Sequence, residues 1–237
     1  MSKDIIIYQP WGGLGDNLQF TTLPELYTNE GYNVYISDQN VYRNNEIFDL
    51  VWRLHPFIKG VSNLTPNAGS CKGFTVFDDN NCIKNMELSH ELSNGTAKYP
   101  KIYYEPKYIS ELEDSLLYDI TSIASSYTDE FIKSRFESVF NKYPNLKRKL
   151  VKFKNINNRS SPDFGDDIIE VNSIFEYCDI INSCNVFVSL LSGSSALASA
   201  VKQDKQFPEI FTFHHSPYNK SFIFNFLNIN LNCEPIE

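Results

Sequence analysis

The chain has 237 residues, 42% of them hydrophobic and 14% aromatic, which is enough apolar mass for a sizeable core and excludes a disordered chain. Its formal net charge of −8 argues against nucleic acid as a partner, because phosphate contacts need clustered Lys and Arg. The one basic run, Lys147-Arg148-Lys149, is interpreted as a solvated loop that leads into a strand.

The five cysteines have no CxxC spacing, so they are interpreted as reduced thiols, and neither a disulfide framework nor a zinc site is expected. No long apolar stretch follows the N-terminus. We therefore expect no signal peptide, no integral membrane segment and a cytoplasmic location.

The first half predicts alternating strands and helices. A continuous apolar run at 5–8 is typical of a buried parallel strand, and a glycine-rich turn follows it. A helix over 17–29, capped by Gly31, and a strand over 33–37 complete one βαβ unit. Further elements are expected as a helix at 46–54, a strand at 74–77, a helix at 84–92 and a strand at 101–104.

A polar stretch at 106–114 is the best candidate for a domain boundary, and the alternation resumes after it. The expected elements are a strand at 116–120, a helix at 128–143, strands at 150–153 and 168–171, a helix at 173–183, a strand at 186–190, a helix at 196–201 and a last strand at 209–213. The predicted fold class is α/β, with two Rossmann-like parallel-sheet lobes that face each other, 1–110 and 111–237, the second ending in an aromatic tail.

The turn Gly12-Gly13-Leu14-Gly15-Asp16 is the most informative motif. Small residues after a parallel strand allow a sharp turn that brings backbone N–H groups near a ligand. The turn is not GxGxxG and has no P-loop lysine, so dinucleotide and P-loop assignments are weak. The carboxylate of Asp16 would repel a phosphate, which favours a base at this place, but a simple helix cap is equally compatible with the spacing.

Together with Asn17-Leu18 and the segment Thr22-Leu23-Pro24-Glu25-Leu26, this turn resembles the opening of the family 9 glycosyltransferases. These are the ADP-heptose–lipopolysaccharide heptosyltransferases and their relatives, which have the GT-B fold. In the family, the carboxylate of the turn is the general base that deprotonates the acceptor hydroxyl, and Asp16 matches its position. The resemblance implies an inverting, metal-independent transfer that needs no cofactor beyond its nucleotide-sugar substrate.

The segment from Ile174 to Ser189 is similar to the helix and strand that precede the family's sugar-nucleotide loop, which usually has the sequence D-T-G-x-x-H. Here the loop keeps its glycine and a hydroxyl, while Leu191 stands at the Asp position and Ala196 at the His position. This departure leaves the identity of the donor open.

The sequence therefore predicts a glycosyltransferase that moves a heptose-like or related sugar from a nucleotide diphosphate to a hydroxyl of a bacterial surface glycan or glycolipid. A glycolipid acceptor would bring it transiently to the inner face of the membrane. Asp16 is the candidate catalytic base, and the expected acceptor-side loop consists of Trp11, Gly12, Gly13, Leu14, Gly15 and Asn17. The expected nucleotide-sugar-binding residues are Thr121, Ser122, Ser192, Gly193, Ser194, Ser195, His214 and His215.

Other interpretations stay open at this point. Ser192 to Ser195 could form an ordinary helix cap, and Thr121 with Ser122 a simple turn. Adjacent histidines in a strand point to opposite faces, so His214 and His215 are not expected to grip one metal ion. The altered loop also fits a non-catalytic GT-B-like protein that binds sugar or nucleotide or serves in an assembly, and a sugar-nucleotide hydrolase is the third hypothesis.

Overall fold

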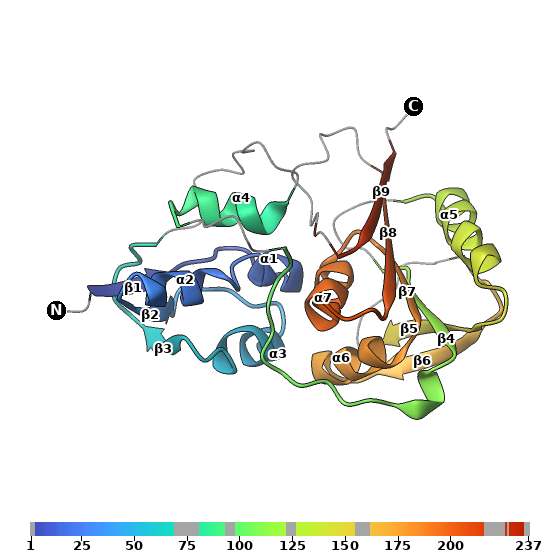
Figure 1. Ribbon diagram of the computed structural model, residues 1–237, viewed down its shortest axis with the longest axis horizontal. Helices are drawn as coiled ribbons and strands as arrows, with labels where there is room; N and C mark the ends of the chain where they lie inside the picture. The colour runs from blue at the N-terminus through green and yellow to red at the C-terminus, as the bar shows by residue number, and fades with distance from the viewer. Residues whose placement is uncertain are drawn as a thin grey trace. The chain divides into compact units, whose positions relative to one another are not determined.

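The computed structural model describes residues 3–68, 81–92, 98–121, 127–154, 162–215, 226 and 228–234. Contacts divide the chain into two compact units, Met1–Glu105 with Lys220–Leu227, and Pro106–Asn219 with Asn228–Glu237. Each unit has its own parallel sheet (Figure 1), which confirms the α/β class. The predicted strand at 74–77 lies outside the described residues.

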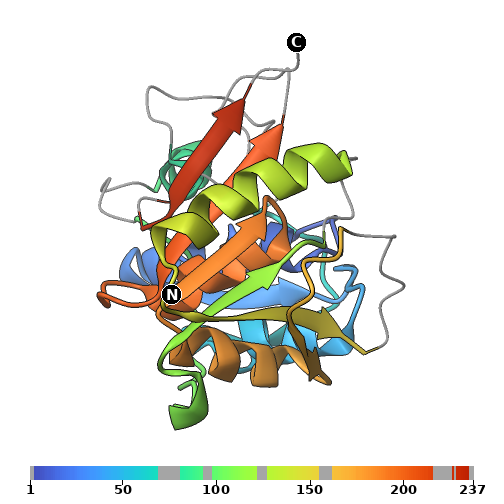
Figure 2. The same ribbon diagram turned by 90° about the vertical axis from the view of Figure 1, so that its right-hand side faces the viewer.

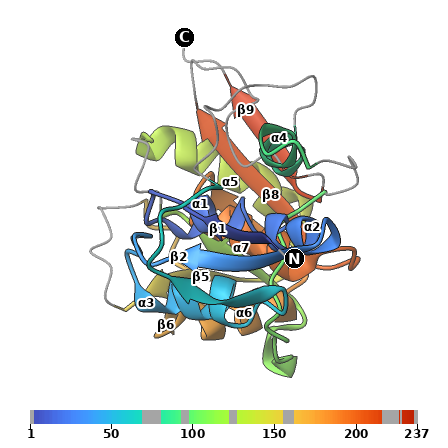
Figure 3. The same cartoon turned by 90° about the vertical axis from the view of Figure 1, so that its left-hand side faces the viewer.

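The first unit is built on a parallel sheet with the order β1-β2-β3. β1 (Lys3–Ile7) has three consecutive buried isoleucines and lies beside β2 (Tyr32–Ser37) in Figure 3. Gly31, at a φ of 86°, ends the preceding helix as predicted. The edge strand β3 (Ile58–Ser62) was not predicted, because Lys59 and Gly60 interrupt its apolar run.

The helix predicted at 17–29 is wrong as one element, since the chain forms α1 (Leu14–Leu18) and α2 (Leu23–Asn29) with a turn between them. Pro24 has no N–H with which to continue a helix from the preceding turn, and it occupies the first turn of α2, where none is needed. The helix predicted at 46–54 is present as α3 (Asn45–Phe48), followed directly by a π-helical segment, Asp49–Arg53. α4 spans Cys82–Ser89.

The strand predicted at 101–104 is also wrong. No regular structure forms there, and the Lys101 N–H donates to the hydroxyl of Thr21, 2.8 Å away, instead of to a neighbouring strand.

The second unit has a six-stranded sheet, all parallel, with the order β6-β5-β4-β7-β8-β9. The strands are β4 (Ser115–Asp119), β5 (Lys147–Phe153), β6 (Asp167–Val171), β7 (Val186–Leu190), β8 (Glu209–His215) and β9 (Asn230–Glu234). The helix α5 (Asp129–Lys142) covers one face of this sheet, and α6 (Ile174–Ser183) with α7 (Gly193–Lys202) covers the other (Figures 1 and 2). A short 3-10 turn, Ser110–Leu112, precedes β4.

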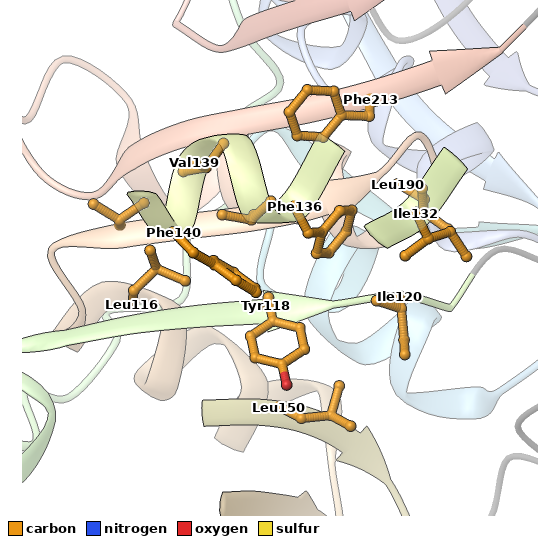
Figure 4. Packing of buried hydrophobic residues seen from close by; sticks show 12 residues of the cluster. Leu116, Tyr118, Ile120, Ile132, Phe136, Val139, Phe140, Leu150, Leu190 and Phe213 are labelled. Carbon is orange, nitrogen blue, oxygen red and sulfur yellow. The ribbon is translucent and has the colours of Figure 1, made fainter. Parts of the chain in front are cut away.

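The core under α5 is largely aromatic (Figure 4). Phe136 is fully buried, and its ring lies within 6.3 Å, centroid to centroid, of the rings of Phe140, Phe164, Phe213 and Tyr118. These side chains come from α5 and from segments separated in sequence, so they fix α5 on the sheet.

Two expectations for this unit are corrected. The basic run at 147–149 belongs to β5 itself, where Arg148 pairs with Asp166 at 2.9 Å and lies over the Phe140 ring. The strand at 209–213 is not the last, because β9 adds to the edge of β8. Among the described residues, no helix has the length and apolar character to cross a membrane.

Candidate functional site

The glycine-rich turn lies at the carboxyl end of β1. Gly13 is the N-cap of α1, with φ −76° and ψ 151°, and Asp16 is the third residue of that helix. The space beside Gly13 is filled by Asp16, since a Cβ added to Gly13 would lie 2.5 Å from Oδ2 of this carboxylate. Gly12 is packed against the chain at 41–43, and its carbonyl accepts the Arg43 N–H at 2.9 Å. A side chain at Gly13 would meet Asp16, and one at Gly12 would meet the chain at 41–43, so both positions need glycine for this close approach.

Asp16 is half-buried, and burial raises the pKa of its carboxyl group above the ordinary value. The Arg43 cation and a hydrogen bond from the Gly13 N–H lower the pKa and offset part of this effect. The bond to Gly13 is the back-reaching half of a capping box, so Asp16 does cap its helix. A carboxylate has about four acceptor positions, so this bond leaves capacity to accept a proton or a hydrogen bond from a ligand.

The buried side chain of Asn17 stabilises the turn through hydrogen bonds. Its buried amide donates to the Gly13 carbonyl at 2.8 Å, and its oxygen accepts the Trp52 indole N–H at 2.9 Å. Both ends of its side chain are thus occupied by the protein, which gives Asn17 a positioning role. Trp11, in contrast, is 37% exposed, while Leu14 is partly exposed and Gly15 is buried.

The second candidate region is the turn between β7 and α7. Ser192 is the N-cap of α7 and closes a capping box with Ser195, whose hydroxyl donates to the Ser192 carbonyl at 2.7 Å. The hydroxyls of Ser192 and Ser194 are 2.6 Å apart. The turn therefore forms the helix cap that the sequence left open as one interpretation. Ser192 and Gly193 are partly exposed at its surface.

Asp119, the last residue of β4, is joined to this turn. Its carboxylate accepts the Thr121 N–H at 2.7 Å, the Thr121 hydroxyl, the Tyr177 hydroxyl at 2.6 Å and a hydrogen bond from the Ser194 side chain. Burial raises its pKa, and these four hydrogen bonds lower it. Thr121 and Ser194, predicted separately from sequence, are thus brought together, and Asp119 and Tyr177 were missed as the link.

The other predicted binding residues are less connected. His214 lies in β8, where it is buried and its Nδ1 lies 2.9 Å from the Tyr127 hydroxyl. His215 is the last residue of the same strand and pairs in register with Glu234 of β9. Ser122 lies outside the described residues.

Leu191 and Ala196, which replace the Asp and His of the family's loop, are both buried. The Leu191 N–H donates to the Phe213 carbonyl at 2.9 Å and extends the pairing of β7 with β8. These two positions therefore belong to the core of the unit, so their side chains contribute packing.

Comparisons with known proteins define the fold. No protein-family model and no curated protein matches the sequence. Among solved structures, the iron-containing dodecameric glycosyltransferase TibC from enterotoxigenic E. coli H10407 matches with a TM-score of 0.64 and 14% identity over 90% of this chain. This chain spans 58% of the length of TibC.

Two further structures match over nearly the whole chain. The E. coli ADP-heptose lipopolysaccharide heptosyltransferase II has a TM-score of 0.58 and 9% identity, covering 98% of this chain and 90% of its own. The family 9 glycosyl transferase from Veillonella parvula DSM 2008 has a TM-score of 0.56 and 11% identity, covering 99% and 86%. The protein thus has the fold of these glycosyltransferases, which confirms at the level of fold the resemblance inferred from residues 12–26.

Among the residues that the structure describes, no group of three His, Cys, Asp or Glu side chains could hold a metal ion.

Proposed function

We propose that this protein is a glycosyltransferase that moves a heptose-like or related sugar from a nucleotide diphosphate to a hydroxyl of a bacterial surface glycan or glycolipid. The observation that carries the proposal is Asp16, a half-buried carboxylate with a raised pKa, held in a glycine-rich turn at the end of the first strand. The fold shared with TibC and heptosyltransferase II supports the same class of reaction. Its acceptor would bring the protein from the cytoplasm to the inner face of the membrane.

In this mechanism Asp16 is the general base. As the acceptor oxygen attacks the anomeric carbon from the face opposite the leaving group, the bond from that carbon to the diphosphate breaks, and the acceptor proton passes to Asp16. A raised pKa suits this role, because it strengthens the carboxylate as a base. The configuration at the anomeric carbon is inverted, and no metal ion takes part.

The second unit supplies the donor-binding residues in this proposal. Thr121 and Ser194 meet at Asp119, and Ser192 and Gly193 are partly exposed at the start of α7. α7 has ten residues, and the backbone N–H groups at its N-terminus favour negative charge, as on a departing diphosphate. Ser122, His214 and His215 complete the proposed set.

A second candidate function is a GT-B-like protein that binds a sugar or nucleotide without transferring it. The buried Leu191 and Ala196 favour it, because neither position can offer a ligand the carboxylate or imidazole that the family's loop carries. Asp16 favours the transferase, since a protein that only binds has no need of a half-buried base.

The test is a thermal-shift panel followed by turnover. A ligand that binds only the folded chain raises its melting temperature, so nucleotide diphosphates and nucleotide sugars are screened on wild type and Asp16→Asn. We expect one nucleotide to stabilise both proteins equally, because the proposed base serves the acceptor and not the donor. A nucleotide that stabilises both without turnover supports the binding protein, and donor consumption without acceptor indicates a hydrolase. No stabilisation by any nucleotide would contradict both a transferase and a nucleotide-binding protein.

A further inference from the structure

Two buried amide groups follow the first two strands of the first unit. Gln9 lies just beyond β1 and is fully buried, and Asn40 lies just beyond β2 and is 9% exposed. The Asn40 side-chain oxygen accepts the Gln9 N–H at 3.0 Å, so the two residues are neighbours in space. Among the residues that the structure describes, none makes a hydrogen bond to either end of the Gln9 amide or to the Asn40 amide nitrogen. Most buried polar side chains in folded proteins do have a partner.

The hydroxyl of Tyr42 belongs to the same group. Burial raises the pKa of Tyr42 to about 12, and the neighbouring Asn40 amide partly offsets this by lowering the pKa. Within the described part of the chain, this buried hydroxyl makes no hydrogen bond of ordinary geometry. Gln9, Asn40 and Tyr42 together offer N–H and O–H donors and the Gln9 amide oxygen as an acceptor, and none of the three carries a charge at neutral pH.

The amides lie where the strand order of the first sheet reverses. The chain proceeds from β1 outward to β2 and β3, and then returns to the other edge of β1, where Ile7 forms a parallel bridge with Ala68. The carboxyl end of β1 is therefore a topological switch point, the place where open α/β sheets bind their ligands. Gln9 stands directly at this end.

The chain that carries Asn40 continues to the glycine-rich turn. The Arg43 N–H donates to the Gly12 carbonyl at 2.9 Å. The Arg43 cation also lowers the pKa of Asp16. The buried amides are thus connected, through one short stretch of chain, to the surroundings of the proposed base.

The chemistry of the three side chains favours a neutral ligand that is rich in hydroxyl groups. A buried anion would need a charge to compensate for its lost hydration, and amides and a phenol supply none. A hydroxyl group both donates and accepts, so adjacent hydroxyls can pair with the oxygen and the nitrogen of one amide. Sugars present hydroxyls in this arrangement.

Because Gln9 has no exposed surface, a ligand reaches its amide only when the neighbouring chain shifts. The segment 40–43 lies beside it, and the side chains of Val41 and Arg43 in this segment are exposed. Buried polar groups that lack a hydrogen bond raise the free energy of the ligand-free state. Ligand hydroxyls that pair with these groups therefore offset the cost of moving the segment.

We propose that Gln9 and Asn40, with Tyr42 beside them, form a subsite that binds adjacent hydroxyl groups of a neutral sugar, the acceptor of the transfer. The acceptor role rests on the proposed function. The subsite adds specificity-determining residues to the turn that holds Asp16, and it binds the sugar through uncharged groups.

The test is an ¹⁵N NMR titration of wild type with the methyl glycosides of glucose, galactose and mannose, and separately with inorganic phosphate. The side-chain amide signal of Gln9 is identified by its loss in Gln9→Met, which has a similar shape and no amide. Tyr42→Phe removes only the hydroxyl. The matched control is Asn81→Ala, because the buried Asn81 amide is bonded at both ends, to the Ile83 N–H at 2.9 Å and the Lys98 carbonyl at 3.1 Å.

We expect at least one glycoside, and not phosphate, to shift the Gln9 signal. Gln9→Met and Tyr42→Phe should each bind that glycoside about five- to tenfold more weakly, the loss of roughly one net hydrogen bond. The melting temperature of Gln9→Met should stay level or rise, since a buried group without a partner is removed. Asn81→Ala should melt at a lower temperature and bind the glycoside as wild type does.

Three results overturn the inference: no glycoside shifts the Gln9 signal, phosphate shifts it instead, or Gln9→Met binds the glycoside as wild type does. A fall in the melting temperature of Gln9→Met as large as that of Asn81→Ala also overturns it, because the amide would then be bonded within the protein. Donor consumption tests the proposed function separately. Turnover without a glycoside at Gln9 keeps the transferase and overturns the subsite, whereas a glycoside at Gln9 without turnover keeps the subsite and overturns the transferase.

Discussion

Gly13→Ala is the substitution that tests the geometry of the turn most directly. The backbone of Gly13 has φ −76° and ψ 151°, which alanine adopts without strain, so the added carbon acts on its surroundings alone. That carbon would lie 2.5 Å from Oδ2 of Asp16, and the carboxylate must retreat by about 1 Å to reach ordinary van der Waals contact. The substitution therefore displaces the proposed base without removing its carboxylate.

A displacement of this size in a catalytic group can cost about 10²-fold in rate, so we expect kcat/KM to fall by roughly two orders of magnitude, about 2.7 kcal/mol of transition-state stabilisation. The folded state should lose only about 1 kcal/mol, the usual scale of a change at an N-cap. The hydrogen bond from the Gly13 N–H also breaks, so the pKa of Asp16 should rise further.

The assay is initial-rate kinetics with the donor found in the thermal-shift panel, together with a thermal melt and an NMR titration of the Asp16 carboxyl group. The control is Ser138→Ala, which deletes an exposed hydroxyl on α5 that donates to the Arg135 carbonyl. Gly12→Ala would not serve, because its added carbon meets the Arg43 nitrogen at 3.1 Å and the Arg43 cation acts on the pKa of Asp16. Full activity of Gly13→Ala, with the pKa of Asp16 unchanged, would refute the placement of the carboxylate.

Three further predictions concern stability. Burial lowers the pKa of His55 to about 4, so between pH 6.5 and about 4 the unfolded chain binds a proton that the folded chain does not. The free energy of unfolding should therefore fall by up to about 3 kcal/mol as the pH drops through this window. Denaturant melts should show this slope in wild type, and an unaltered slope in His55→Gln would contradict it. Phe136→Ala empties the middle of the core under α5 and should cost about 3–5 kcal/mol in urea unfolding, whereas a loss below about 1 kcal/mol would mean that the site collapses or is not packed. Ser173→Ala removes the hydroxyl that accepts the Glu176 N–H at 3.0 Å at the start of α6, so thermal melts should report a loss of about 1 kcal/mol, and an unchanged melting temperature would show that this cap contributes nothing.

The strands that sequence predicted well are those with long buried apolar runs. Ile5 to Ile7 and Val186 to Leu190 are continuous because both faces of a parallel sheet are covered, and runs this short, bounded by turn residues, favour a strand over a buried helix. β9 escaped prediction because its sequence, Asn230 to Glu234, is polar, and only pairing with β8 makes it a strand.

The residues of the candidate site also differ in whether a local sequence pattern could predict them. The glycine turn and the serine turn are local signals, visible as small residues and hydroxyls between a strand and a helix. Arg43, whose cation lowers the pKa of Asp16, comes from a later segment of the chain and is held there by its backbone bond to Gly12. The link from Asp119 to Tyr177 likewise joins β4 to α6, and no local pattern predicts a contact between residues so far apart in sequence.

The measurement that tests the central claim most directly is the rate at which nucleotide diphosphate is released from the stabilising donor, with and without acceptor, by wild type and Asp16→Asn. We predict acceptor-dependent release by wild type and a loss of about 10²–10⁴-fold in Asp16→Asn, the usual contribution of a general base, with donor affinity preserved. Equal release by the two proteins in the presence of acceptor would contradict the assignment of Asp16 as the base.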